Sequence, residues 1–382
     1  MNIRTFDLER IQSLYENTVE FNLTESGFHP LQLDEILDEQ QLRQLAQLNL
    51  GYGQTNGDPR LRDRIAGLYE NAGAGNVLVT NGSAEANFVA AHTLLNAGDE
   101  VVIMIPNYMQ LWGIVEEMLC TPVAFHMREE NNWAPDLEEL ARVVNPKTKM
   151  IAVCNPNNPT GYVLTSQEME AIVAIAREHD AWIYSDEIYR GAELNYTELE
   201  SFYGKYDKVV VNGGLSKSYA LPGLRLGWLV GPEKVTDNAW TYRDYTSICS
   251  SLISQYVAEI VLRPKNREKI LNRNRKMLNE NLVNLQTWLD KHGDVFSFIP
   301  PQAGGMAFMS YDLDINSTDL SHWLREQESV FIIPGDCYGM DGYIRIGVGE
   351  RSDFLLAGLE KMSRAIQEKF KLTTKNGHIT RY

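Results

Sequence analysis

Between residues 76 and 231, short runs of apolar residues alternate with longer segments that show helical periodicity. Continuous apolar runs are typical of strands buried on both faces, so the alternation predicts an α/β fold with a mostly parallel sheet covered by helices. The predicted strands are Val77–Thr80, Glu100–Ile105, Thr121–Met127, Met150–Cys154, Ala181–Tyr184, Val209–Val211 and Leu226–Val230. The predicted helices are Ala84–Asn96, capped by Ser83, then Tyr108–Leu119, Leu137–Val144 and a helix from the Thr165–Glu168 capping box to His179.

The pattern changes after Pro232, where a mostly helical stretch from Gln255 to Lys291 can carry the chain out of the sheet. The remainder mixes strands and helices, which predicts a second, smaller α+β domain. Its predicted strands are Val295–Ile299, Met306–Met309 and Tyr343–Val348, and its predicted helices are Leu320–Gln327 and Asp353–Phe370.

The first fifty residues hold a short helix, a loop over Thr24–Pro30 and a glutamine-rich helix around Asp34–Gln47. We expect this segment to pack on the small domain or on a partner subunit. The tail Thr373–Tyr382 is polar without periodicity, so we expect it to be mobile. The predicted organisation is an N-terminal segment (1–45), a large domain (46–265) and a small C-terminal domain with a mobile tail (266–382).

Length and charge limit the classes of protein. The chain has 382 residues, more than one core usually holds, which agrees with two domains. A formal net charge of −16 argues against a nucleic-acid partner, because phosphates need a clustered basic surface. The four cysteines form no pair or cluster typical of a metal site, so they predict buried free thiols in a reducing compartment. With no signal peptide and no membrane-length apolar run, we expect a soluble, cytoplasmic protein.

Chemically active residues gather where the predicted strands end. In an open parallel sheet, ligands bind beyond the carboxyl ends of the strands. The run Thr80-Asn-Gly-Ser-Ala84 joins such an end to a helix start. The amides of Ser83 and Ala84, with the Ser83 hydroxyl, would face an anion at the helix N-terminus. The alternative is an ordinary capped turn.

Two more stretches follow strand ends. Tyr108 can lie flat on a planar cofactor, although core packing is the simpler interpretation of this residue alone. Asn158 lies in the run Asn155-Pro-Asn-Asn-Pro-Thr-Gly161, whose turn formers also suit an ordinary loop. Held between rigid elements, the Asn158 amide can donate a hydrogen bond to a phenolic oxygen.

Asp186 ends the strand in Tyr184-Ser-Asp-Glu-Ile-Tyr-Arg190. A carboxylate beside a buried pyridine nitrogen keeps that nitrogen protonated, and the protonated ring then acts as an electron sink. Tyr189, three residues further on, would reach a ring oxygen. The alternative is that Asp186 caps the following turn.

Lys217 follows the apolar run Lys208–Val211 in a segment rich in glycine and serine. An ordinary surface lysine lies in a polar, helix-favouring context, which this segment is not. A desolvated lysine is a nucleophile that forms a Schiff base with an aldehyde. Ser216 and Arg225 supply two phosphate ligands in the same segment, since arginine makes forked, charge-assisted bonds. The alternative, an ordinary surface lysine, does not explain why glycine, serine and arginine residues surround Lys217 in this segment.

Together these motifs resemble the class I/II aminotransferases of fold type I, which depend on pyridoxal 5′-phosphate (PLP). The resemblance covers about residues 45 to 365, with the motifs in the expected order. It implies a mostly parallel, seven-stranded sheet sandwiched by helices, together with a smaller α+β domain. The matching runs are Thr80–Ala84, Asn155–Gly161, Ser185–Tyr189, Ser216–Arg225 and Tyr343–Ile346.

The resemblance also implies a role for each matching residue. Lys217 would form the Schiff base and shuttle a proton, with Asp186 and Tyr189 as its catalytic partners. Arg345 would bind the substrate α-carboxylate, with Asn158 beside it. Tyr52 matches the tyrosine that reaches the phosphate in a neighbouring subunit, which implies a homodimer with shared active sites. The implied PLP ligands are Tyr52, Ser83, Ala84, Tyr108, Asn158, Asp186, Tyr189, Ser216, Lys217 and Arg225.

One region departs from the common pattern. Many relatives carry a Gly-x-Pro-Asp-type loop over the substrate, whereas this chain has Asn22-Leu-Thr-Glu-Ser-Gly-Phe-His-Pro30. The stretch is similar to the arginine-processing branch, which includes capreomycidine synthase and the PLP-dependent arginine oxidases. Glu25 and Gly27 are therefore candidate substrate-binding residues, because a carboxylate near the substrate tail favours a cationic side chain. The alternative for Glu25 is a solvated or helix-capping residue. Phe28, His29 and residues 242–247 are expected to line the side-chain pocket.

Three functions remain open on the sequence. The leading hypothesis is an amino-acid aminotransferase that passes the amino group to a 2-keto acid. The second keeps the cofactor but changes the reaction to that of an oxidase, hydroxylase, lyase or cyclase acting on L-arginine or a related cationic amino acid. The third is a non-catalytic regulator on the same scaffold. A regulator would not need its catalytic positions to be filled, whereas all of them are filled in this chain.

Overall fold

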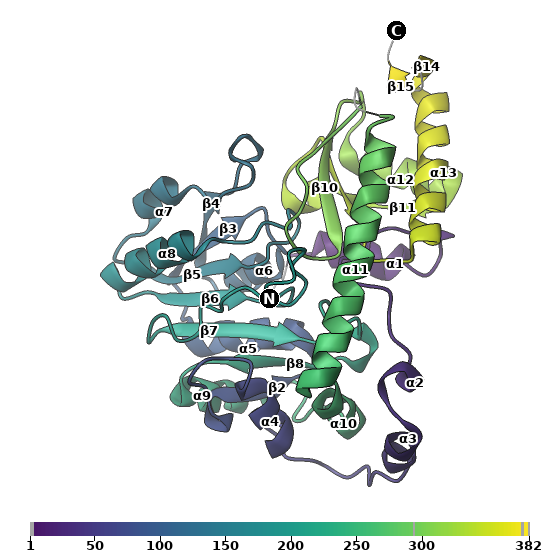
Figure 1. Ribbon diagram of the computed structural model, residues 1–382. Coiled ribbons are helices and arrows are strands. Elements are labelled where there is room, and N and C mark those ends of the chain that lie inside the picture. Colours follow the sequence, from purple (N-terminus) through teal and green to yellow (C-terminus); the bar gives the residue numbers. More distant parts are fainter. Residues whose placement is uncertain (1–3, 293–294, 376–377, 381–382) are drawn as a thin grey trace.

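The computed structural model describes residues 4–292, 295–375 and 378–380. Figure 1 shows a large sheet on one side of the molecule and a smaller sheet with its helices on the other, joined by the long helix α11 (Pro264–Leu289). The large sheet has seven strands in the order β2-β8-β7-β6-β5-β3-β4. Only β8 runs antiparallel to its neighbours. The strands are β2 (Val77–Thr80), β3 (Glu100–Ile105), β4 (Thr121–His126), β5 (Thr148–Cys154), β6 (Trp182–Asp186), β7 (Val209–Gly214) and β8 (Gly227–Val230).

Alternate residues of the central strands enter two separate cores. Val102 and Met104 of β3 belong to one hydrophobic cluster, while Val101 and Ile103 belong to the other. Because side chains alternate across a strand, both faces of this sheet are buried, which explains the continuous apolar runs. The helices on this part of the chain are α4 (Pro59–Ala66), α5 (Gly82–Leu94), α6 (Gln110–Glu117), α7 (Leu137–Val143), α8 (Ser166–Glu178), α9 (Glu233–Arg243) and α10 (Leu252–Val261).

Every strand predicted for the large sheet is present; β2 and β3 have the predicted ends, and the other five begin or end at a different residue. Helix α5 begins at Gly82, and its N-cap is Asn81. Ser83 is therefore a first-turn residue and not the cap that the sequence predicted. The long helical stretch divides into α10 and α11, because Pro264 starts a new helix where it has no amide to donate. Helices α4 and α9 were not predicted.

The smaller sheet has four antiparallel strands in the order β12-β13-β10-β9. Helices α11, α12 and α13 share a second hydrophobic core with it. The elements are β9 (Phe296–Phe298), β10 (Met306–Tyr311), α12 (Ser317–Glu328), β12 (Ile333–Pro334), β13 (Tyr343–Gly347) and α13 (Ser352–Phe370). At the tail, β14 (Thr373–Lys375) pairs with β15 (His378–Thr380), and the rest of the tail predicted to be mobile, residues 376–377 and 381–382, lies outside the described residues.

The N-terminal segment contacts both parts of the molecule. Strand β1 (Phe21–Asn22) pairs in parallel with β11 (Val330–Phe331) beside the small sheet. Helix α1 (Asp7–Tyr15) precedes it, and the predicted glutamine-rich helix is two short helices, α2 (Leu33–Ile36) and α3 (Glu39–Ala46). Among the described residues, no helix combines the length and the apolarity needed to cross a bilayer.

Candidate active site

A cavity of about 400 Å³, called the site cavity below, lies where the strands of the large sheet end. It brings together every predicted site residue except Tyr52 and Gly27. The convergence agrees with the rule that open parallel sheets bind ligands at their carboxyl edge. The predicted residues that line it are Glu25, Ser83, Ala84, Tyr108, Asn158, Asp186, Tyr189, Ser216, Lys217, Arg225 and Arg345.

An anion-binding cradle forms one end of the site cavity. Gly82 has a φ of +77°, a backbone conformation that favours glycine, and it starts helix α5 just before Ser83. A Cβ at Gly82 would lie 2.6 Å from Arg225 Nη2, so only glycine lets this guanidinium approach the helix start. Arg225 Nη1 also donates to Ser216 Oγ at 3.2 Å. Helix N-terminal amides, hydroxyls and a guanidinium are the groups that hold phosphate in proteins.

Asp186 supplies a carboxylate at the end of β6. Its Oδ1 accepts a hydrogen bond from the Ile188 amide at 3.1 Å. Burial raises the pKa of Asp186 to about 6, although hydrogen bonds from Ile188, Asn212 and Asn87 oppose that rise. A cation placed against this carboxylate would favour its charged form, as the protonated ring nitrogen of PLP does.

A chain of hydrogen bonds links Arg345 to Tyr189. Asn158 Oδ1 accepts from Arg345 Nη1 at 3.0 Å and from Tyr338 Oη at 3.1 Å, which fixes the orientation of the Asn158 amide. Its Nδ2 then donates to Tyr189 Oη at 3.0 Å. Tyr189 Oη also lies 2.9 Å from Ser26 Oγ. Arg345 is buried, yet its Nε has no partner among the described residues.

Lys217 forms an ion pair with Glu25, whose Oε1 lies 2.5 Å from Lys217 Nζ. Burial alone raises the pKa of Glu25, but the Lys217 charge and hydrogen bond, followed by Arg345, lower it to about 2. The amides of Ser26 and Gly27 donate to the same oxygen at 2.8 and 3.2 Å. Glu25 is therefore an anion held by Lys217 and two amides; it caps no helix, although its side chain remains 46% exposed.

Three consecutive residues of the N-terminal segment each contact a different predicted site residue. The Thr24 carbonyl accepts from Arg345 Nη2 at 2.5 Å, Glu25 pairs with Lys217, and Ser26 contacts Tyr189. Glycines of the small sheet and the loops beside it make room for this segment. A Cβ at Gly305 or Gly349 would clash with the Gly27 carbonyl, and one at Gly347 would clash with the Glu25 carbonyl. We call these three positions the glycine slot.

Tyr108 lines the site cavity and lies under helix α1. Its hydroxyl donates to Glu9 Oε1 at 2.7 Å, and Phe6 packs edge-on against its ring at 4.8 Å between centroids. Burial, followed by the charge of Glu9, raises the pKa of Tyr108 well above its ordinary value. Tyr108 therefore stays neutral, and its position suits the predicted packing against a planar ring.

The sequence did not indicate the contribution of helix α1. Leu8, Glu9, Gln12 and Glu16 of α1 and its C-cap line the site cavity. Residues 8, 12 and 16 share one face at intervals of four, a spacing that is visible in the sequence but typical of any amphipathic helix. Only the fold reveals that this face covers the predicted site.

Several predicted residues lie elsewhere. Tyr52 is 85% exposed and does not line the site cavity of its own chain. Gly27 lies beside Lys217, since a Cβ there would be 3.4 Å from Lys217 Cδ, but it does not line the cavity. Phe28 is buried in the small-sheet core, and His29 pairs with Glu350. The prediction that Phe28, His29 and residues 242–247 line a side-chain pocket is therefore wrong for this cavity.

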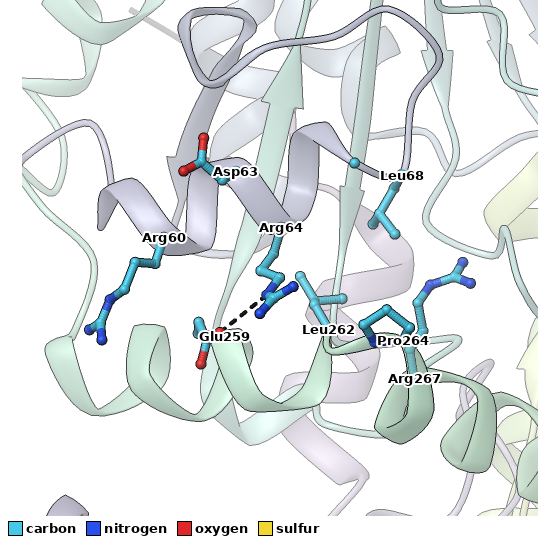
Figure 2. Close-up of a pocket in the computed structure, with 9 residues that line it drawn as sticks. Arg60, Asp63, Arg64, Leu68, Glu259, Leu262, Pro264 and Arg267 are labelled. Atoms are coloured by element: carbon cyan, nitrogen blue, oxygen red, sulfur yellow. Dashed lines mark hydrogen bonds and ion pairs between the residues drawn. The ribbon is translucent and has the colours of Figure 1, made fainter.

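Figure 2 shows a different hollow, between α4, the end of α10 and the start of α11. Arg64 Nε lies 3.2 Å from Glu259 Oε1 there, and Arg267 pairs with Glu198 at 2.6 Å. It holds none of the predicted site residues. Its three arginines, Arg60, Arg64 and Arg267, are already paired with carboxylates.

Glu187 follows Asp186 but does not line the site cavity. Burial raises its pKa to about 7 from 4.5, against the opposing charge of Arg190. The folded state thus holds the proton more tightly than the unfolded chain. The resulting stabilisation is complete below about pH 4.5 and is lost as the pH rises through about 7.

Glu187→Gln should therefore gain stability relative to the wild type as the pH rises from 5 to 8, because its amide carries no charge to bury. Urea unfolding at several pH values measures this difference. Glu170→Gln, which removes an exposed carboxylate on α8, is the control and should show no such trend. A constant difference between Glu187→Gln and the wild type across this range would contradict the assignment.

Known proteins are similar to this chain in sequence and in fold. The family model described as "Aminotransferase class I and II" matches residues 19–356. A PLP-dependent aminotransferase from Streptococcus suis 89-1591 has a crystal structure with a TM-score of 0.91 and 33% identity, covering 96% of this chain and 99% of its own.

Two curated relatives carry specific names. Capreomycidine synthase of Streptomyces vinaceus is 28% identical over 90% of this chain and 89% of its own. Aromatic-amino-acid aminotransferase 2 of Thermococcus litoralis is 28% identical over 77% of this chain and 76% of its own length. The match over most of the chain leads to one conclusion: this protein belongs to the class I and II aminotransferase family, whose enzymes use PLP.

Proposed function

We propose that this protein is an amino-acid aminotransferase in which Lys217 joins the cofactor and moves the substrate α-proton. One observation carries the proposal. Lys217 lines one cavity together with the Asp186 carboxylate at the end of β6 and the cradle at the start of α5. The buried Arg345, whose Nε has no partner among the described residues, lines the same cavity. Transamination needs those groups together.

The residues of the site cavity fit PLP. Ser83, Ala84, Ser216 and Arg225 would hold its phosphate in the cradle. When bound, the cofactor supplies an electron sink for the negative charge that develops on the substrate. Asp186 would hold the proton on the ring nitrogen, and Tyr108 would lie against the ring face. Asn158 and Tyr189 would donate to the ring oxygen.

Arg345 would orient the amino-acid substrate. Its guanidinium is already fixed by Asn158, Tyr338 and Thr24, and its Nε remains free to donate to an α-carboxylate. A carboxylate held there would present the α-proton to Lys217. Lys217 would take up that proton and return it at the neighbouring carbon, while Tyr108 and helix α1 exclude water. The amino group would then pass to a 2-keto acid in a second half-reaction.

Single-turnover spectroscopy tests this proposal. Adding one amino acid to the PLP-loaded protein, with no keto acid, should convert the cofactor band into that of the aminated form and release one keto acid. A 2-keto acid should then restore the original band, which is the signature of ping-pong kinetics. If none of the common amino acids yields the aminated form, the aminotransferase assignment is wrong.

Glu25 favours a second candidate reaction at the same site. Its carboxylate lies beside Lys217, and one relative of similar length is named capreomycidine synthase. The alternative is an oxidase, hydroxylase, lyase or cyclase acting on L-arginine or a related cationic amino acid. Oxygen consumption with L-arginine, or ammonia release without an added keto acid, would favour it over transamination.

We also propose that the protein acts as a cytoplasmic homodimer, with domains divided near residues 45 and 265. The exposure of Tyr52 (85%) and Leu50 (72%), two residues apart, suits the dimer, because neighbouring exposed apolar side chains are typical of contact surfaces. In that dimer Tyr52 would donate to the phosphate bound in the partner subunit. The four cysteines are free, which suits a reducing compartment.

Tyr52→Phe should weaken PLP binding by about tenfold or more, since it removes one hydrogen bond to a charged group. Titration of the apoprotein with PLP, followed by absorbance, measures the dissociation constant. Tyr196→Phe, at another exposed tyrosine, is the matched control and should bind normally. An unchanged dissociation constant for Tyr52→Phe, or a monomer in sedimentation, would rule out the shared site.

A further inference from the structure

A cluster of buried polar side chains lies beside Asp186 on one face of the large sheet. Tyr184 is two residues before Asp186 on β6, and Asn212 on β7 is the register partner of Asp186, so the three side chains point to the same face. Asn87 of α5, the helix that packs on this face, completes the cluster. Asn87, Tyr184 and Asn212 are each at most 3% exposed, and none of them lines the site cavity.

Hydrogen bonds fix the orientation of the Asn87 carboxamide. Its Oδ1 accepts from Tyr184 Oη and, at 2.5 Å, from Asn212 Nδ2. Its Nδ2 donates to Gln110 Oε1 at 2.7 Å, and Gln110 Nε2 donates in turn to the Ala84 carbonyl at 3.1 Å. Because a carboxamide nitrogen carries two hydrogens, one N–H of Asn87 remains after the bond to Gln110.

That remaining N–H serves Asp186. The Asp186 carboxylate accepts side-chain hydrogen bonds from Asn212 and Asn87 in addition to the bond from the Ile188 amide. Burial raises the pKa of Asp186 to about 6, and these three bonds oppose the rise. Asp186 has no ion-pair partner in the described part of the chain, so its negative charge depends on these donors. A neutral Asp186 would lack the charge that a protonated ring nitrogen requires.

Asn87 also connects Asp186 to the anion cradle. It lies on α5 four residues after Ser83, and Gln110 ties it to the Ala84 carbonyl. PLP carries its phosphate on a short arm of a rigid ring, so the groups that bind the phosphate and the ring nitrogen must keep a matching separation. We propose that Asn87 is a positioning residue that holds the Asp186 carboxylate in place, relative to the cradle, for the ring nitrogen of PLP. The inference rests on the proposed function and adds a residue to it.

Tyr184 supports Asn87 in this role. If the oxygen and nitrogen of the Asn87 carboxamide exchanged places, Oδ1 would face the Gln110 oxygen and the Asp186 carboxylate, which would repel it. The Tyr184 hydroxyl and the Asn212 amide, both donating to Oδ1, favour the observed orientation. Removing the Tyr184 hydroxyl should therefore loosen the Asn87 amide without removing it.

The test compares PLP with an analogue that carries a carbon atom in place of the ring nitrogen and so cannot pair with Asp186. Dissociation constants for both are measured by titrating the apoprotein and following the absorbance of the bound compound. The wild type should bind PLP more tightly than the analogue. Asn87→Ala should reduce that preference by about tenfold, because it removes one hydrogen bond to a charged group, and should change binding of the analogue little. Tyr184→Phe should reduce it by about threefold.

Asn281→Ala is the matched control. This asparagine of α11 is also buried, and its amide donates to the Val348 and Glu350 carbonyls outside the site cavity. Its replacement should lower the urea midpoint but leave the preference for PLP unchanged. If Asn87→Ala does not fold, Tyr184→Phe carries the same test.

Two outcomes separate this inference from the function on which it rests. A wild type that prefers PLP, with variants at Asn87 and Tyr184 that prefer it equally strongly, would show that the cluster has only a structural role. A wild type that binds PLP and the analogue with the same affinity would instead refute the proposed role of Asp186 itself.

Discussion

Lys217→Ala is expected to abolish turnover, with a loss in kcat of at least about 10⁴-fold, because no other lysine among the described residues lines the site cavity. The variant should also lose the absorbance band of the covalently bound cofactor, although the phosphate cradle around Arg225 remains. Absorbance spectra and steady-state kinetics with the preferred amino acid measure both effects.

Lys208→Ala is the matched control for this variant. Lys208 precedes β7, nine residues before Lys217, and pairs with Asp180 at 2.5 Å on the surface. Its replacement should leave the band and the activity unchanged. A Lys217→Ala protein that retains wild-type activity would overturn the site assignment and the proposed role of Lys217 in catalysis.

Asp186→Asn is expected to lower kcat by about 10³-fold, because an amide cannot hold a proton on the ring nitrogen by charge. Cofactor binding should weaken less than catalysis, since the cradle residues Ser83, Ser216 and Arg225 are untouched. Asp186→Glu keeps the charge and should recover part of the activity. Equal kcat values for Asp186→Asn and the wild type would show that this carboxylate does not serve the ring nitrogen.

The strand–helix alternation and the chemistry at the strand ends were predictable because both depend on local sequence. Asp186 and Lys217 each follow an apolar run, and the parallel sheet brings such ends to one edge without any further information. The same logic placed Ser83, Ala84, Asn158 and Arg225 at the site cavity. The prediction of helix ends was less accurate. At α5 both Asn81 and Ser83 suit the N-cap, and the choice between them depends on where the preceding strand ends.

Only Glu25 of the covering wall of the cavity was predicted, and that prediction came from the resemblance and not from a pattern in the sequence. Contacts from Glu9 to Tyr108 and from Glu25 to Lys217 span 99 and 192 residues, and no periodicity encodes them. The face of α1 formed by Leu8, Gln12 and Glu16 resembles that of any amphipathic helix. Such pairings follow from the tertiary arrangement and are visible only in the folded chain.

The glycine slot has a mechanical consequence. The carbonyls of Glu25 and Gly27 lie close to Gly305, Gly347 and Gly349, so the N-terminal segment packs tightly on the small sheet. A tilt of the small sheet relative to the large sheet would move Glu25 and Ser26 away from Lys217 and Tyr189, whereas Thr24 would move together with Arg345 of β13. Bulkier residues in the slot would therefore displace the segment and, with it, the Glu25 carboxylate that pairs with Lys217.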